Sequence, residues 1–462
     1  MLQQDLDIDL DLIAKLDRNG PRYTSYPTAD RFNETFDAAA YTRWAPKRNT
    51  AGAPRPLSLY VHLPFCQSLC YYCACNKIIT RDEGKAGKYL RYLYQEIGMQ
   101  AALFRGDARV TQMHWGGGTP TFYSTEQLTE LFATLGQAFE FDADGEYSIE
   151  IDPRTVDPAT IAALRAMGFN RVSFGVQDFD PDVQRAVNRV QSVDDVRAVV
   201  AAARGAGFAS VSMDLIYGLP RQSPRSFATT LDHVADLRPD RVAVYSYAHL
   251  PARFRSQRLI ADIEVPPAPV KLQLLGVAAE KLSRAGYVYI GMDHFALPDD
   301  TLAVAQRQGR LHRNFQGYST HAECDLVGLG VSAIGAIGPT YSQNTRTLSD
   351  YYARLDRGEL PIMRGVELTA EDLLRRSVIH TLMCHFELSK DAVEVSHLID
   401  FDDKFASELE DLEELERSGL VRLEDRWIIV TPKGRALIRS ICMVFDAYLR
   451  REKETRRYSR TI

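Results

Sequence analysis

The chain has 462 residues, of which 45% are hydrophobic and 25% are charged, the proportions of an ordinary globular protein. Its net charge of −6 and its pI near 6.0 give no electrostatic footprint for nucleic acid. No apolar run approaches the roughly 18 residues of a membrane span, and the start, MLQQDLDIDLDL, lacks the basic and apolar segments of a signal peptide. The sequence therefore predicts a cytoplasmic protein without a membrane or nucleic-acid partner, with one domain of barrel size and a smaller one.

Residues 1–55 are predicted to form an N-terminal extension or lid. An acidic amphipathic helix near residues 8–16 is followed by GPRYTSYPT at 20–28. Two prolines and a glycine make this second segment extended and stiff. Two interpretations remain open: a strap that packs its two tyrosine rings on the barrel, or a lid that offers Arg22 to an anionic substrate.

From residue 57 the chain alternates short apolar runs with amphipathic segments, which is typical of an α/β fold. Strands are predicted at 57–62, 110–115, 147–151, 171–176, 210–216 and 241–248. Helices are predicted at 87–104, 125–139, 158–167, 193–206, 224–237 and 271–285. Six β-then-α units imply a parallel sheet with right-handed crossovers. We therefore expect residues 56–365 to form a partial six-unit (β/α) parallel barrel.

The last third of the chain is less regular. Residues 286–365 are loop-rich and end in GLGVSAIG, and we expect them to close the barrel and contribute to the pocket. Residues 366–462 form a mostly helical domain, in which LEELERSGLVRLEDRWIIVTPKGRALI predicts a helix, a β-hairpin and a helix in a winged-helix shape. Because the first of these helices is rich in acids that repel phosphate, we expect a structural or lid role.

Four of the seven cysteines lie within ten residues, in the segment YVHLPFCQSLCYYCACNK after the first predicted strand. The C-x3-C-x2-C spacing of Cys66, Cys70 and Cys73 suits three ligands of a [4Fe–4S] cluster. The fourth iron then lacks a nearby cysteine, which indicates chemistry as well as electron transfer. Zinc with Cys75 as fourth ligand is an alternative, although these spacings crowd a tetrahedral site. In extended backbone, Cys75 would point away from the other three.

The carboxyl ends of the predicted strands carry the unusual residues. This is where the chemistry of parallel α/β barrels lies. They are the cysteine loop after the first strand, glycines 116–118 after the second, Glu150 near the end of the third, Gln177 after the fourth, Asp214 late in the fifth, and Tyr247 and Ala248 at the end of the sixth. We expect these positions to meet at one mouth.

The cysteine spacing, with the aromatic Tyr72 before the last cysteine, resembles the radical S-adenosylmethionine superfamily. More narrowly, the CxxxCxxCxC form with Cys75, HWGGGTP at 114–120, GVQDF at 175–179 and GPRYTSYPT at 20–28 resemble the oxygen-independent coproporphyrinogen III oxidases. The likeness runs from about residue 5 to about residue 450. Related radical haem chaperones, the alternative, lack GPRYTSYPT and the cysteine at position 75.

The resemblance implies a [4Fe–4S] cluster on Cys66, Cys70 and Cys73 and two molecules of S-adenosylmethionine. For the cluster-bound molecule it implies contacts from Tyr60, Gly116, Glu150 and Ile334. For the second molecule it implies contacts from Tyr72, Gly117, Gly118, Gln177, Arg189, Asp214 and Ala248. It also implies catalytic importance for Cys75, Tyr60, Glu150 and Asp214. Ordinary salt bridges at the barrel rim remain an alternative for the acids and the arginine, and a packed thiol remains one for Cys75.

The implied reaction turns two propionates of coproporphyrinogen III into vinyl groups, giving protoporphyrinogen IX in haem biosynthesis. A 5′-deoxyadenosyl radical would remove a hydrogen atom from the propionate, and loss of CO2 and one electron would follow. A low-potential electron donor such as flavodoxin, an unknown electron acceptor and a monomeric state are expected. The four carboxylates need cationic or N–H donors, for which the candidates are Arg22, Lys77, His312 and Arg313.

Overall fold

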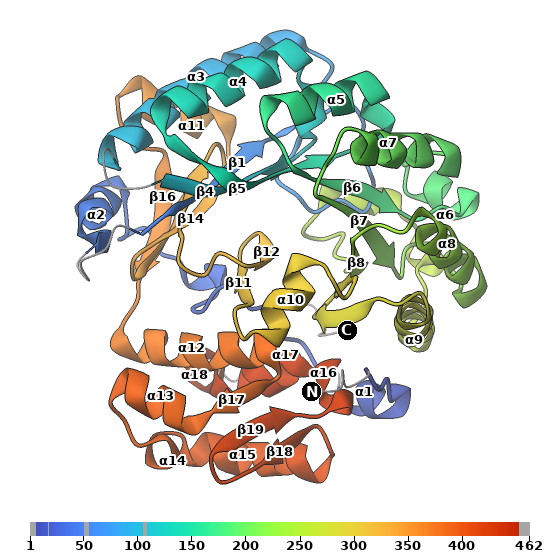
Figure 1. Ribbon diagram of the computed structural model, residues 1–462, viewed down its shortest axis with the longest axis vertical. Coiled ribbons are helices and arrows are strands. Elements are labelled where there is room, and N and C mark those ends of the chain that lie inside the picture. Colours follow the sequence, from blue (N-terminus) through green and yellow to red (C-terminus); the bar gives the residue numbers. More distant parts are fainter. Residues whose placement is uncertain (1–5, 17, 50–54, 105–108, 452–462) are drawn as a thin grey trace.

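The structure is a computed structural model that describes residues 6–16, 18–49, 55–104 and 109–451. Figure 1 shows a large α/β unit above a smaller, mostly helical one. The ends of the predicted N-terminal extension and C-terminal domain, residues 1–5 and 452–462, lie outside the described residues. Among the helices that are described, none combines the length and the apolar character needed to cross a membrane.

The large unit is built on a 12-stranded sheet in the order β16-β15-β14-β13-β1-β4-β5-β6-β7-β8-β10-β9. Its centre is parallel and contains the six predicted strands: β1 (Leu57–Leu63), β4 (Arg109–Gly117), β5 (Glu140–Ile151), β6 (Arg171–Gln177), β7 (Ser210–Tyr217) and β8 (Arg241–Ser246). In Figure 1 the sheet curves into an open arch. The predicted partial barrel is confirmed.

Helices cover the convex side of the arch (Figure 1). They are α3 (Glu83–Leu103), α4 (Thr125–Ala138), α5 (Pro158–Met167), α7 (Val193–Gly205), α8 (Pro224–Leu237) and α9 (Ala268–Arg284). Ser124, Ser192 and Ser223 begin α4, α7 and α8 with capping boxes, which satisfy backbone N–H groups of the first turn. The predicted ranges of α5 and α8 are confirmed to the residue, and the others differ by a few residues at their ends.

Alternation along the strands separates apolar from polar side chains. On β6, Val172, Phe174 and Val176 are buried in the core that the sheet shares with the outer helices. The intervening positions Ser173 and Gly175 line a cavity on the concave side. Because successive side chains of a strand point to opposite faces, the interior of the arch is polar at this level.

The prediction of loop-rich sequence over residues 286–365 is wrong. This region supplies six strands of the sheet: β9 (Val288–Gly291), β10 (His294–Ala296), β13 (Asp325–Leu329), β14 (Ile334–Ile337), β15 (Thr340–Asn344) and β16 (Ile362–Glu367). β13 is parallel to β1, and β14 to β16 continue antiparallel. The strands are only three to six residues long, too short for a clear alternating pattern.

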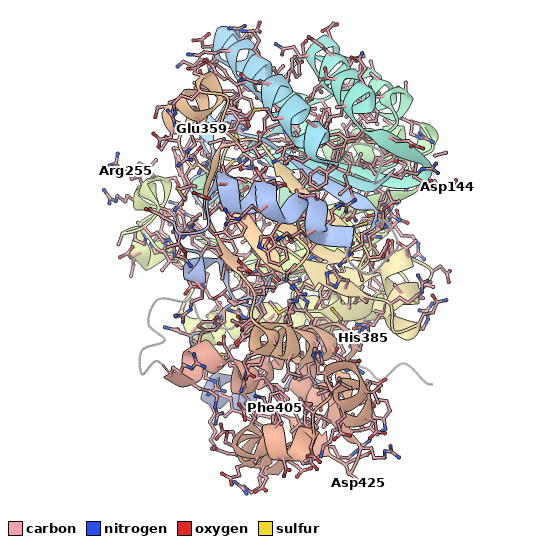
Figure 2. The ribbon with its side chains drawn as sticks, turned by 90° about the vertical axis from the view of Figure 1, so that its left-hand side faces the viewer. Asp144, Arg255, Glu359, His385, Phe405 and Asp425 are labelled. Atoms are coloured by element: carbon pink, nitrogen blue, oxygen red, sulfur yellow. The ribbon has the colours of Figure 1, made fainter. Side chains whose placement is uncertain are left out.

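A small hairpin occupies the concave side of the arch. It consists of β11 (His312–Asn314) and β12 (Gly317–Ser319), and Figure 1 shows it between the arch and the lower unit. The hairpin contacts α12 (Ala370–His385), the first helix of the lower unit. In Figure 2, His385, the last residue of α12, lies where the two units meet.

The lower unit contains the predicted helix, hairpin and helix. They are α15 (Ala406–Arg417), β18 (Val421–Leu423), β19 (Trp427–Val430) and α16 (Pro432–Arg435), with β17 (Glu387–Ser389) as a third strand. Phe405, which Figure 2 labels inside this unit, is fully buried in its core. Glu408 of α15 is also buried and accepts from Arg375 Nη1 at 2.9 Å, so this acid has a structural partner.

The segment 20–28 packs its tyrosines on the lower unit, and the expectation that they pack on the barrel is wrong. Tyr23 and Tyr26 belong to the core of the lower unit, and Tyr23 Oη donates to Asp446 Oδ2 at 2.9 Å. Arg22, which directly precedes Tyr23, reaches the barrel unit, where its Nη1 donates to Asp293 Oδ2 at 2.8 Å. The segment thus joins the two units, and Arg22 already has an anionic partner.

A buried ion pair fixes the N-terminal extension to the barrel. Arg48 Nη1 donates to Asp325 Oδ2 at 2.8 Å, and the two side chains are 1% and 3% exposed. Removing one partner of a buried pair leaves the other charge uncompensated.

We expect Arg48→Met to lower the free energy of unfolding by about 3 kcal/mol, measured by urea denaturation. Lys47→Met, at the exposed neighbouring position, should change it by less than about 0.5 kcal/mol. Equal effects of the two variants would show that the ion pair contributes nothing.

Candidate active site

A cavity of about 530 Å³ opens at the carboxyl ends of the central strands. The residues that line it come from the cysteine loop and from the ends of β4, β5, β6, β7 and β8. The predicted site residues among them are Cys66, Cys70, Cys73, Cys75, Tyr72, Gly117, Gly118, Glu150, Gln177, Arg189 and Asp214. Most of the predicted positions therefore meet at one mouth.

The cysteines lie on the loop between β2 (Phe65–Cys66) and β3 (Ile78–Ile79), which pair with each other and close the loop. Donors from the barrel reach two of the sulfurs. Thr119 Oγ1 is 3.4 Å from Cys66 Sγ, and Arg189 Nη1 is 3.5 Å from Cys70 Sγ. Hydrogen bonds to sulfur tune the potential of iron–sulfur centres.

The spacing of the thiols separates the two metal interpretations. Sulfur ligands lie about 2.3 Å from a zinc ion, so ligand atoms of one ion are within about 4 Å of each other. Over the described ranges, one group of three metal-ligating side chains brings its atoms within 4.8 Å of one another, namely His321, Glu323 and Cys324 before β13. Cys66, Cys70 and Cys73 are spread more widely, which fits a cluster whose ligands sit on different irons and argues against a zinc ion.

Cys75 does not point away from the other cysteines, as extended backbone would require. The chain bends at Cys75 on its return to β3, and the thiol lines the same cavity. Its hydrogen bond to Cys73, together with the charge of Lys77, lowers the pKa of Cys73 to about 6, although burial opposes the shift. The prediction of its direction is wrong because the backbone here is a turn.

Asp152, which follows β5, is a residue that the sequence reasoning missed. Its Oδ2 accepts from Arg189 Nη1 at 3.0 Å and from Arg154 Nη2 at 2.7 Å. Both guanidinium groups also reach Cys70 Sγ, at 3.5 and 3.7 Å. Burial raises the pKa of Asp152, but the two arginines outweigh it and lower the pKa overall. Asp152 thus directs two cations at one sulfur, and its place at a strand end was the signal that could have found it.

Glu150 presents an open carboxylate to the cavity. Its Oε1 is 3.1 Å from His114 Nε2, its side chain is 44% exposed, and His114 Nδ1 is 2.7 Å from Ser148 Oγ. Partial desolvation by the surrounding protein opposes ionisation, but the hydrogen bond to His114 lowers the pKa of Glu150. Tyr60 does not line the cavity, and its ring stacks on His114 at 6.0 Å between centroids. A Cβ on Gly116 would lie 2.9 Å from the Glu150 carboxyl carbon.

The pKa of Asp214 is shifted in the opposite direction from that of Glu150. Burial, and then the charge of Glu150, raise the pKa of Asp214 to about 7. Its Oδ2 accepts a hydrogen bond from Ser173 Oγ at 3.2 Å. The mouth therefore holds one carboxylate that is ionised at neutral pH and one that gains a proton near pH 7.

Some predicted positions differ in detail. Gly116 and Gly117 are the last residues of β4 instead of following it. β8 ends at Ser246, so Ala248 lies beyond the strand. The carbonyl of Ala248 accepts from Gln257 Nε2 at 3.1 Å, and the same group donates to the Tyr72 carbonyl at 3.0 Å. Ile334 begins β14 and lies outside the cavity lining.

Comparison with known proteins agrees with this geometry. Residues 60–234 match the radical SAM superfamily, and residues 368–437 match the family described as the HemN C-terminal domain. The chain is 50% identical to the oxygen-independent coproporphyrinogen III oxidases of Escherichia coli (strain K12) and Salmonella typhimurium, over 100% of each chain. The Pseudomonas aeruginosa enzyme of that name is 51% identical over 98% of both chains.

This chain belongs to the oxygen-independent coproporphyrinogen III oxidases. The solved structure of the Escherichia coli coproporphyrinogen III oxidase, described as a radical SAM enzyme, superposes with a TM-score of 0.92 and covers 96% of this chain and 100% of its own. As a member of this family, the oxidase uses a [4Fe–4S] cluster and S-adenosylmethionine. The spread of the three cysteine thiols around the cavity fits the cluster.

The last glycine of the GGGTP segment lies against the cysteine loop. A Cβ on Gly118 would be 2.6 Å from the carbonyl carbon and oxygen of Pro64, which are backbone atoms that cannot turn aside. We expect Gly118→Ala to displace the loop and to retain less than half of the wild-type iron and sulfide per chain after anaerobic reconstitution. Gly136→Ala in α4, where a Cβ meets no atom within 4 Å, is the control and should retain wild-type iron. Full iron in Gly118→Ala would mean that the loop tolerates the displacement.

Proposed function

We propose that this chain catalyses the anaerobic oxidative decarboxylation of two propionates of coproporphyrinogen III, giving protoporphyrinogen IX. The observation that carries the proposal is the cavity in which three widely spaced cysteines of one loop face Glu150 and Asp214. It occurs in a chain that is 50% identical, over its full length, to enzymes named for oxidising this substrate without oxygen. Each propionate loses a hydrogen atom, CO2 and one electron, and an electron acceptor of the cell takes up that electron.

The three cysteines Cys66, Cys70 and Cys73 would hold the cluster. Bound there, the reduced cluster and S-adenosylmethionine supply a one-electron cleavage that yields a hydrogen-abstracting radical. Asp152 and the two arginines that it holds keep positive charge beside Cys70. The chain's own task is to orient both ligands and to keep water away from the reacting carbon.

Two molecules of S-adenosylmethionine are proposed, because the predicted contacts fall into two groups. The first group consists of Tyr60, Gly116, Glu150 and Ile334. Tyr60 and Gly116 lie beside the His114–Glu150 pair, and Ile334 lies beside Gly328, which pairs with Tyr60 in the sheet. The second group consists of Tyr72, Gly117, Gly118, Gln177, Arg189, Asp214 and Ala248. The Gln257 side chain donates to the carbonyls of both Tyr72 and Ala248. A Cβ on Gly175 would meet the side chains of both Gln177 and Arg189.

Cys75, Tyr60, Glu150 and Asp214 are proposed as the catalytically important side chains. Glu150, ionised at neutral pH, suits an ammonium group, and Asp214 suits a ribose hydroxyl or an ammonium. Cys75 has an exposed thiol within the cavity, which supports a place beside the substrate and not in the core.

For the organisation of the chain we propose an N-terminal extension or lid (1–55), a catalytic domain (56–365) and a C-terminal domain (366–462). The cores support the last two, while the extension contributes Phe36 to the barrel core and Ile13 to the C-terminal one. We further propose that the enzyme acts in the cytoplasm as a monomer, with a low-potential donor such as flavodoxin.

The test is anaerobic turnover. Cluster-loaded protein is mixed with S-adenosylmethionine, coproporphyrinogen III, a reductant and a cell extract as electron acceptor, and porphyrins and 5′-deoxyadenosine are separated by chromatography. We expect protoporphyrinogen from the wild type and none from Cys70→Ser. If 5′-deoxyadenosine forms while the tetrapyrrole stays intact, the substrate assignment is wrong.

The raised pKa of Asp214 predicts a pH dependence of ligand binding. Below pH about 7 this side chain is protonated and loses acceptor strength toward a hydroxyl or ammonium donor. We therefore expect the affinity for S-adenosylmethionine to rise with pH, by at most about tenfold per unit below pH 7, and to level off above it. Equilibrium dialysis of cluster-loaded protein between pH 5.5 and 8.5 measures this. Asp214→Asn should abolish the dependence, whereas Asp236→Asn, at an exposed site on α8, should keep it; the proposal for Asp214 fails if both variants keep it.

A further inference from the structure

A group of cationic and aromatic side chains lies on the concave side of the arch, beyond Tyr245 of the cavity lining. Tyr245 contacts the His294 ring at 5.8 Å between centroids, and the His294 ring contacts the Tyr318 ring at 5.3 Å. The Arg313 guanidinium lies over the Tyr318 ring, 4.8 Å from its centroid. These contacts lead from the cavity to Arg313 on hairpin β11–β12.

Arg313 is buried without an anion. It is 4% exposed, and its Nε and Nη1 are buried and have no hydrogen-bond partner in the part of the chain that the structure describes. The Tyr318 ring attracts the face of the guanidinium group but accepts none of its in-plane N–H bonds. An unpaired buried charge is costly, so these donors indicate a site for an anionic ligand.

Buried arginines with a structural role look different in this protein. Arg48 is paired with Asp325 at 2.8 Å, and Arg375 is paired with Glu408 at 2.9 Å. Arg313 has no such ion pair with any described carboxylate. The contrast argues that the protein does not itself provide the anion for Arg313.

The surroundings of Arg313 carry an excess of positive charge. Asp293 is the acid of this group, and it already accepts from Arg22 at 2.8 Å. His294 adds no further charge here, because burial, and then the charge of Arg313, lower its pKa to about 3 and keep it neutral. A carboxylate entering this space would therefore meet the charge of Arg313, whose Nε and Nη1 have no partner among the described residues.

The structure also distinguishes Arg313 from the other candidates for the propionates. Arg22 is bound to Asp293, and Lys77 Nζ donates to the Cys73 carbonyl at 2.8 Å. Burial lowers the pKa of His312 to about 4, so this side chain is neutral at physiological pH. Arg313 combines a permanent charge with donors that no described residue occupies.

Resting on the proposed function, we propose that the Arg313 guanidinium binds a propionate carboxylate of coproporphyrinogen III and so anchors the tetrapyrrole beside Tyr245. The planar fork of arginine N–H groups matches a carboxylate with two parallel hydrogen bonds. The anchored propionate is one that does not react in that turnover, which leaves another propionate to reach the cavity at the cysteine loop. Arg313 is thus a specificity-determining residue for the carboxylate-bearing substrate.

Binding of coproporphyrin III, the fluorescent oxidised form with the same four propionates, tests the anchor apart from turnover. Fluorescence titration under anaerobic conditions compares cluster-loaded wild type, Arg313→Lys and Arg313→Gln. We expect Arg313→Gln to bind at least tenfold more weakly and Arg313→Lys to fall between it and the wild type. A porphyrin with ethyl groups in place of the propionates should bind the wild type and Arg313→Gln equally. In turnover, KM should rise more than kcat falls.

Thermal unfolding separates an anchor from a structural arginine. Because Arg313 is unpaired, Arg313→Gln should keep or raise the wild-type Tm, whereas Arg48→Gln, which breaks a buried ion pair, should lower it. A Tm loss in Arg313→Gln equal to that in Arg48→Gln, without recovery in Arg313→Lys, overturns the proposal.

The remaining outcomes are also decisive. If the wild type makes protoporphyrinogen and Arg313→Gln binds coproporphyrin III equally well with an unchanged KM, the anchor is wrong and the proposed function stands. If the wild type neither binds coproporphyrin III nor converts coproporphyrinogen III, the proposed function itself fails.

Discussion

The parallel pairing of β1 with β4 on one side and β13 on the other is the constraint on which the site depends. Parallel strands end at the same edge, so the cysteine loop, the glycine segment and the turn after β13 emerge together. They come so close that side chains are excluded. A Cβ on Gly118 would meet the Pro64 backbone at 2.6 Å, and one on Gly330 would meet the His62 carbonyl oxygen at 2.7 Å. The end of β1 and the residues that lead into the cysteine loop are thus packed against the backbone at Gly330 and Gly118.

The distribution of charge in the cavity depends on which residues the neighbouring strand ends place beside each acid. β5 brings Glu150 and then Asp152 to the edge, and these two acids have different environments. Asp152 is neutralised by Arg154 and Arg189, whereas Glu150 is hydrogen-bonded to a histidine and stays open to the cavity. The first acid therefore fixes cations beside a sulfur, and the second remains able to receive a ligand.

The sequence predicted the features that repeat or carry strong local signals. Six strands, six helices and the three cysteines were found because apolar periodicity and C-x3-C-x2-C spacing are local patterns. β9 to β16 were missed because strands of three to six residues are set by tertiary pairing. The direction of Cys75 was wrong because the chain bends at Cys75 and Asn76 instead of continuing as an extended strand. The partner of Arg22 could not be predicted, since its contact with Asp293, 271 positions away, depends on the folded chain.

The linkage between the two units explains why the concave side can hold uncompensated charge. Tyr23 and Tyr26 fasten segment 20–28 to the lower core, while Arg22 crosses to Asp293 of the barrel unit. Hairpin β11–β12 is covered in turn by α12, where Tyr318 Oη donates to the Met383 carbonyl at 3.0 Å. Contacts from both units therefore keep Arg313 buried, although burying its unpaired charge is unfavourable. Proteins leave buried charges unpaired mainly at functional sites, and here the unpaired Arg313 is connected through Tyr318 and His294 to Tyr245 of the cavity lining.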